Sequence, residues 1–225
     1  MKYINITPSL VTFVKGGSAT KKYIDARIKE IKKLHLKEIS LFLTGADINL
    51  REYVKKELQK TEINSINHIH LRHDMNEAEA QHYFENYKTR KFTIHCLYRK
   101  NYLKWSKNIR KCIGIENNKD FSDSINKKEI TKFGGLVIDL SHYIDVRGGF
   151  PNDLLDSLVK DFPIIANHAS AILKNGYSWH MAHSKNQYNY ISTIPKKYFS
   201  DVVSLEIGNS FESQIRYIEY IKKLI

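Results

Sequence analysis

The apolar residues of this chain form short runs that alternate with longer amphipathic stretches. Residues 135–140 show the pattern most plainly, because a run of small and apolar side chains there contains a single acid, Asp139. In an extended strand the side chains alternate between faces, which places Val137 and Asp139 on one face and Leu136 on the other. A strand that is apolar outward and carries an inward carboxylate near its end is typical of the parallel strands of a (β/α)8 barrel.

The same pattern recurs along the chain and predicts eight strands. They are expected at residues 3–7, 38–43, 66–72, 92–97, 112–116, 135–140, 163–168 and 201–207. Helical segments are expected between and after them, at 19–34, 48–60, 76–88, 102–109, 153–160 and 211–225, and a long loop with irregular helix is expected at 169–198. This order predicts the α/β class and a (β/α)8 TIM barrel, with residues 1–225 as one domain. An open doubly wound sheet is the competing fold, but it would not gather residues from six strands around one centre.

The composition indicates which kinds of partner the chain could bind and in which compartment it would reside. The chain of 225 residues has a formal net charge of +12, which favours anionic partners such as nucleic acid or phosphorylated compounds, although scattered lysines also simply solvate helices. The two cysteines, Cys96 and Cys112, are too few for a disulfide framework. No run approaches the ~20 apolar residues of a membrane helix, and residues 1–4 carry no signal-peptide pattern. We therefore expect a cytoplasmic protein without a membrane partner.

Each predicted strand from the third onward brings one potential metal ligand to its C-terminal end. These residues are His70, His95, Glu116, Asp139, His168 and Glu206. A single such residue is often only a helix cap or a hydrogen-bonded core side chain. Several buried acids and imidazoles that face one another cost several kcal/mol each unless a cation or protons compensate them. The set therefore predicts a divalent metal site, for which zinc, manganese and iron are suitable ions.

Further residues are candidates for substrate binding, namely Arg72, His73, Arg147, Trp179 and His180. Arg72 is expected on the inward face of the third strand, where it would neutralise acids or contact an anionic substrate. His73 is close enough in sequence to compete with the preceding histidine as a metal ligand. Arg147 stands beside two glycines and would grip a phosphate or pair with Asp145. Trp179 would stack on a sugar or base, or anchor the long loop.

The sequences Ile115-Glu116-Asn117 and Asp139-Leu140-Ser141-His142, followed by strand-end His168 and Glu206, resemble the xylose isomerase-like barrel superfamily. The resemblance extends as an ordered series over residues 38–225. The superfamily includes sugar isomerases and epimerases, and abasic-site nucleases of the endonuclease IV type. In the epimerase branch the resemblance implies one divalent ion held by Glu116, Asp139, His168 and Glu206. It also implies that the two glutamates exchange a proton beside a carbonyl group, and that His142 helps to bind a sugar or sugar phosphate.

The nuclease branch implies three zinc ions. By resemblance, His70 and His95 with a bridging Glu116 form the first site, the four residues of the epimerase branch form the second, and His142 with His183 forms part of the third. The chain has Met181-Ala182-His183 where that branch has Asp-x-His, so the third site lacks its carboxylate unless His180 substitutes for it.

The predicted loops after the second and third strands are too short to hold a flipped-out nucleotide, which favours an isomerase or epimerase over the nuclease. A multinuclear iron oxidative enzyme and a binding protein without turnover are further alternatives on the same barrel.

Overall fold

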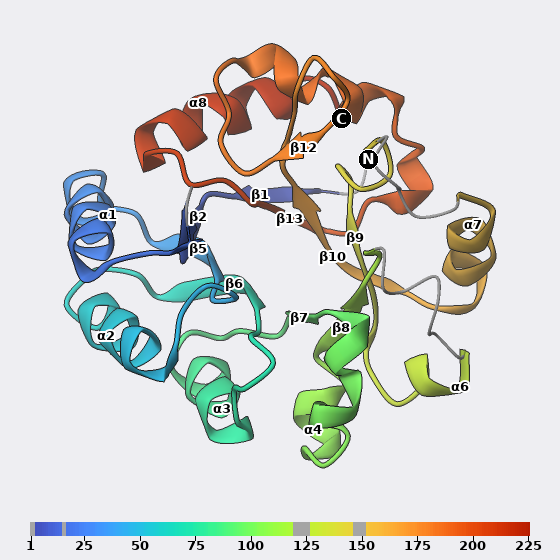
Figure 1. The fold of residues 1–225 in the computed structure, drawn as a ribbon, viewed down its shortest axis with the longest axis horizontal. Coiled ribbons are helices and arrows are strands. Elements are labelled where there is room, and N and C mark those ends of the chain that lie inside the picture. The colour runs from blue at the N-terminus through green and yellow to red at the C-terminus, as the bar shows by residue number, and fades with distance from the viewer. Residues whose placement is uncertain (1–2, 15–16, 119–126, 146–151) are drawn as a thin grey trace.

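The computed structural model describes residues 3–14, 17–118, 127–145 and 152–225. Parallel strands form a central barrel in this part of the chain, and helices surround it (Figure 1). The strand order is β1-β13-β10-β9-β8-β7-β6-β5-β2. The two ends of this order are halves of one strand, interrupted at Pro8. β1 (Asn5–Thr7) pairs with β13 and β2 (Ser9–Val11) pairs with β5, so the sheet closes on itself. The predicted (β/α)8 barrel is confirmed.

The remaining barrel strands follow the predicted order. They are β5 (Glu38–Phe42), β6 (Ser65–His70), β7 (Phe92–Ile94), β8 (Ile113–Glu116), β9 (Gly135–Asp139), β10 (Ile164–Ala169) and β13 (Val202–Leu205). The α-helices are α1 (Lys21–Lys33), α2 (Ile48–Leu58), α3 (Glu77–Asn86), α4 (Lys107–Arg110), α6 (Lys127–Ile130), α7 (Asn152–Asp161) and α8 (Phe211–Ile221). The 3-10 helices are η1 (Cys96–Tyr102), η2 (Lys185–Thr193) and η3 (Lys196–Tyr198). Two small antiparallel hairpins are formed by β3 (Phe13–Val14) with β4 (Gly17–Ser18), and by β11 (Ala171–Ile172) with β12 (Ser178–Trp179).

The helices cover the outward faces of the strands because each can bury an apolar face, as the sequence pattern predicts. In α1 the buried residues Ile24, Ile28 and Ile31 recur at helical spacing and share one face. The N-terminus of α1 is capped by Thr20, whose side chain accepts a hydrogen bond from the Tyr23 N–H. The apolar faces of helices and strands thus form one continuous core around the barrel.

Several strand ends differ from the prediction. The first strand continues to Val11, because the chain resumes pairing after Pro8. β6 ends at His70 and not at residue 72, and β7 ends at Ile94, since η1 begins directly after His95. Gly135 starts β9 with φ +145°, and a Cβ atom there would lie 2.2 Å from the carbonyl oxygen of Pro163. Only glycine therefore lets β9 and β10 start side by side.

The interior of the barrel is polar, unlike the layer outside it. Thr7, Ser40 and Ser204 are buried and joined by hydroxyl hydrogen bonds, with Oγ–Oγ distances of 2.7 and 2.8 Å. His68 and Thr93 lie in the same interior and are fully buried. Polar side chains therefore support the centre of the barrel. None of the helices in the described part of the chain combines the length and the apolarity that a membrane crossing needs.

Candidate metal centre

Four neighbouring strands bring four potential metal ligands together at the C-terminal end of the barrel. Glu116 is the last residue of β8 and Asp139 the last of β9, while His168 lies in β10 directly beside Asp139. Glu206 follows β13, and its N–H donates to the carbonyl of Ala169, which extends the ladder by one residue. One ligand atom from each of the four residues lies within 4.8 Å of the others, and all four residues are buried. Their spacing therefore allows one ion to contact all four.

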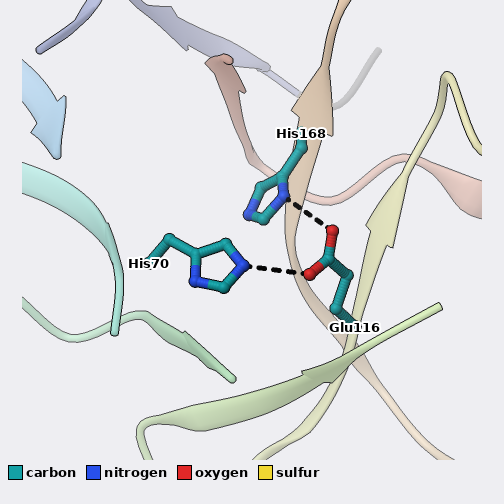
Figure 2. A group of neighbouring side chains, drawn as sticks. All are labelled: His70, Glu116 and His168. Carbon is teal, nitrogen blue, oxygen red and sulfur yellow. Dashed lines mark hydrogen bonds and ion pairs between the residues drawn. The ribbon is translucent and has the colours of Figure 1, made fainter. Parts of the chain in front are cut away.

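The Glu116 carboxylate lies between the imidazoles of His70 and His168 (Figure 2). Its Oε2 is 3.0 Å from Nε2 of His70, and its Oε1 is 3.4 Å from Nδ1 of His168. Nε2 of His95 approaches the same Oε2 at 3.3 Å, from the N-terminus of η1. Burial and the neighbouring His70 lower the pKa of His95 to about 4. His95 is therefore neutral at pH 7, in the form that binds metals.

Two polar atoms of the cluster have no hydrogen-bond partner. Asp139 uses Oδ1 to accept hydrogen bonds from the N–H and hydroxyl of Ser141, at 2.7 and 2.6 Å, but its buried Oδ2 accepts no hydrogen bond and lies 3.5 Å from Nε2 of His142. Nδ1 of His168 is also buried without a hydrogen bond. Buried polar atoms are usually satisfied, so an unpaired carboxylate oxygen beside an unpaired imidazole nitrogen fits a bound cation. Carboxylate oxygen and imidazole nitrogen are the donors that zinc, manganese and iron accept.

The charges of the cluster also favour a bound cation. Burial, followed by the nearby carboxylates of Asp139 and Glu116, raises the pKa of Glu206 well above its ordinary value. Burial also opposes ionisation of Glu116, but the neighbouring imidazoles of His168 and His70 prevail and lower its pKa well below the ordinary value. The cluster thus contains more carboxylate than its own imidazoles compensate, and a divalent cation would supply the missing positive charge.

A cavity of about 310 Å³ opens above the cluster. It is lined by Phe13, Thr44, His95, Glu116, Asn118, His142, His180 and Glu206. Nε2 of His142 lies 3.5 Å from Oδ2 of Asp139. Burial disfavours its protonation, but the charges of Asp139 and Glu116 outweigh this effect and raise the pKa of His142. Nδ1 of His180 lies 3.1 Å from the carbonyl oxygen of Glu206, and its ring packs edge-on against Phe13.

Other candidate residues lie elsewhere. Arg72 follows the end of β6 and pairs with Asp74, with Nε 3.5 Å from Oδ1. His73 is exposed and stacks on Tyr98, so His70 occupies the ligand position. Trp179 is 39% exposed and pairs with β11 in the small hairpin.

His183 is exposed and lines a different cavity, and the ligand clusters of the described residues do not include it. It lies at the start of η2, where Gln187 accepts a hydrogen bond from the His183 N–H. Arg147 lies outside the described residues.

Several residues of the site were not candidates from the sequence. Alternation along β6 places His68 on the face of His70, which is a usable signal, and it lies in the barrel below the cluster. Phe13, Thr44 and Asn118 reach the cavity from loops or from a two-residue strand. Such segments have no periodicity from which their direction could be predicted.

No family model matches the chain, and no curated protein matches it. Among solved structures, a xylose isomerase domain protein from Planctomyces limnophilus is similar with a TM-score of 0.55 and 10% identity, over 99% of this chain and 96% of that one. A putative uncharacterized protein from Parabacteroides distasonis ATCC 8503 is similar with a TM-score of 0.50 and 12% identity, over 97% of this chain and 99% of that one. The chain therefore has a xylose isomerase-like TIM barrel fold.

Proposed function

We propose that the protein is a divalent-metal-dependent isomerase or epimerase of a small sugar or sugar phosphate. The observation that carries this proposal is the cluster of Glu116, Asp139, His168 and Glu206, of which the two glutamates line a small cavity. A volume of about 310 Å³ is at the lower end of the range for small-molecule sites, which suits a monosaccharide better than a nucleic acid duplex. Cys96 and Cys112 form no disulfide bond in the described part of the chain, which agrees with a cytoplasmic location as part of this proposal.

The two glutamates have the placement and the contrasting environments that proton transfer needs. They come from β8 and from the residue after β13, two strands that β9 and β10 separate in the sheet, and both line the cavity. The pKa of Glu116 is lowered and that of Glu206 is raised in the metal-free protein. With the ion bound, we assign one of the two carboxylates to remove a proton from the substrate carbon and the other to return it. A bound divalent ion would polarise the carbonyl group of the substrate.

His142 and His180 lie at the cavity wall, where they would orient the hydroxyl groups of the substrate. Nδ1 of His180 faces the carbonyl of Glu206 and therefore carries the proton, which leaves Nε2 as an acceptor. Phe13 packs against this ring and would cover the apolar face of a sugar.

Solvent deuterium exchange tests this proposal. The protein is loaded with Mn²⁺ or Zn²⁺ and incubated in D₂O with a panel of ketoses and ketose phosphates, and NMR follows the carbon beside the carbonyl. We expect deuterium at that carbon, and a loss of about 10³-fold or more in rate for Glu116→Gln and Glu206→Gln. Glu62→Gln, at an exposed surface pair, is the matched control and should exchange normally. No deuterium with any sugar would reject the proposal.

A zinc phosphodiesterase is the second candidate, because His70 and His95 both approach Oε2 of Glu116. This arrangement offers a second group of ligands beside the first, as two-metal phosphoryl chemistry requires. Two bound ions per chain and nicking of an abasic-site duplex, lost in His95→Ala, would favour this candidate. One bound ion and no nicking would reject it.

A further inference from the structure

A line of three buried side chains continues from the metal centre into the barrel, and none of the roles above explains it. His68 on β6, Thr93 on β7 and His168 on β10 are each fully buried. Oγ1 of Thr93 lies 2.6 Å from Nε2 of His68 and 3.2 Å from Nε2 of His168. The two Nε2 atoms are 3.4 Å apart. Polar groups at such positions require matched donors and acceptors, because no bulk water can replace a missing partner.

The direction of His168 decides which of its nitrogens can bind an ion. Its Nδ1 faces Glu116 and Glu206, at 3.4 and 3.5 Å, and its other nitrogen faces away from Glu116 (Figure 2). A neutral imidazole has one protonated nitrogen and one lone pair. For Nδ1 to offer its lone pair to a cation, the proton must therefore reside on Nε2, where the oxygen of Thr93 is within reach as an acceptor.

The hydroxyl of Thr93 can complete that arrangement, in which the proton of His68 lies on Nδ1, a buried atom without a hydrogen-bond partner among the described residues. If the oxygen of Thr93 accepts from His168, its single hydroxyl hydrogen is available for Nε2 of His68, which must then carry a lone pair. The Nε2 atoms of His68 and His168 are both within hydrogen-bond distance of the same hydroxyl oxygen, so this one group can link the two rings. Phe42 packs edge-on against both imidazoles, with ring centroids 5.7 and 4.9 Å away, and restricts their rotation.

We propose that Thr93 and His68 are positioning residues that keep the ring proton of His168 on Nε2 and so direct its Nδ1 lone pair at the metal. This inference rests on the metal centre of the proposed function. Hydrogen-bond partners of a ligand histidine orient the ring and raise its basicity, and their loss weakens metal binding about 10- to 100-fold.

The protonation of the rings can be observed directly. The Zn²⁺-loaded protein, labelled with ¹⁵N at histidine, is studied by long-range ¹H–¹⁵N correlation spectroscopy. We expect His168 to be protonated on Nε2 and His68 on Nδ1, with Nε2 of His68 in the shift range of a hydrogen-bonded acceptor. Protonation of His68 on Nε2 would overturn the proposal, and this measurement needs no variant.

Metal affinity tests the role of the hydroxyl group. Thr93→Val keeps the shape of the side chain but removes the hydroxyl, whereas Thr93→Ser keeps the hydroxyl. In titrations with Co²⁺, followed by the visible absorption of the bound ion, we expect affinity to fall about 10- to 100-fold for Thr93→Val and to stay near wild type for Thr93→Ser. Equal affinity of Thr93→Val and wild type would overturn the proposal.

The titration also separates this proposal from the proposed function. Binding of Co²⁺ requires no substrate, so a protein that binds the ion but exchanges no deuterium rejects the isomerase while leaving the positioning role intact. Circular dichroism of each variant shows whether it is folded. If Thr93→Val does not fold, Thr93→Ala supplies the same comparison with a smaller side chain, and the ring protonation of the wild type decides the question independently.

Discussion

Two groups of buried charges in this protein are neutralised in different ways. Between α2 and α3, Arg51 is only 2% exposed and contacts two acids. Its Nε lies 2.8 Å from Oε2 of Glu79, and its Nη1 lies 3.0 Å from Oδ1 of Asp74 and 2.9 Å from the carbonyl oxygen of Ala46. At the metal centre, the ion pairs of the described residues give Glu116, Asp139 and Glu206 only histidine partners.

The difference separates a cluster that the chain neutralises itself from the cluster that we propose binds a metal. The carboxylates near Arg51 have a guanidinium group that donates fixed hydrogen bonds, so the chain supplies its own counter-ion. Among the described residues, the acids at the barrel end include a buried oxygen of Asp139 that accepts no hydrogen bond, and the adjacent Nδ1 of His168 makes none either. The chain leaves these acids without a fixed positive partner, which costs stability unless an ion binds. Buried charge therefore indicates function here only where its partner is missing.

Metal binding should produce the largest effect on stability. Zn²⁺ or Mn²⁺ at about 1,000 times its dissociation constant should stabilise the fold by about 4 kcal/mol. For a chain of this size each kcal/mol raises the melting temperature by about 2–4 °C. Differential scanning calorimetry of chelator-treated and metal-loaded protein measures the shift. Asp139→Asn, which loses one ligand charge, should shift much less, and an unchanged wild-type melting temperature would remove the distinction between the two clusters.

Loss of Arg51 should have the next largest effect, and only on stability. Arg51→Met leaves Glu79 largely buried without a counter-ion, and should lower the free energy of unfolding by about 3 kcal/mol. Urea unfolding measures this loss. Arg51→Lys, which keeps the charge but loses the planar group of donors, is the matched control with an intermediate loss expected. The metal-induced shift in melting temperature should persist in both variants. Its loss in Arg51→Met would show that the two clusters are coupled.

The sequence predicts the barrel and the central ligands because both depend on strand alternation. Side chains of a strand alternate between its two faces, which places Glu116, Asp139 and His168 on inward faces. Because the strands are parallel, their C-terminal ends lie at one end of the barrel. Residues beyond the strands were not predictable in this way. His183 lies after a stretch without periodicity, where the cap of η2 sets its direction. Arg72 lies beyond the last residue of β6, so strand alternation no longer predicts the direction of its side chain.

Contacts between distant segments have no sequence pattern at all. Arg51 and Glu79 are 28 residues apart and belong to different helices, and either alone is an ordinary charged helix residue. The line from His68 through Thr93 to His168 depends on the closure of the barrel, because residues of three separate strands point into one interior. Alternation shows that these side chains face inward, but only the closed sheet shows which of them meet.

Neutralising one acid of the metal centre should change the free energy of unfolding least, and the size of this change should depend on pH. Because burial and the neighbouring carboxylates raise the pKa of Glu206 in the folded protein, folding is favoured most at pH values below its ordinary pKa of 4.5. This contribution is lost as pH rises through the raised pKa. In the presence of chelator, wild type should therefore lose stability relative to Glu206→Gln as pH rises above 4.5, by on the order of 1 kcal/mol or more.

Urea unfolding across this pH range measures the difference between Glu206→Gln and wild type. Saturating Zn²⁺ should reverse its sign, because the charged carboxylate then binds an ion that the amide holds more weakly. Parallel pH profiles of the two chelated proteins would mean that Glu206 already has a compensating partner in the fold. The barrel end would then resemble the Arg51 cluster, and the missing positive charge would no longer be an argument for a metal.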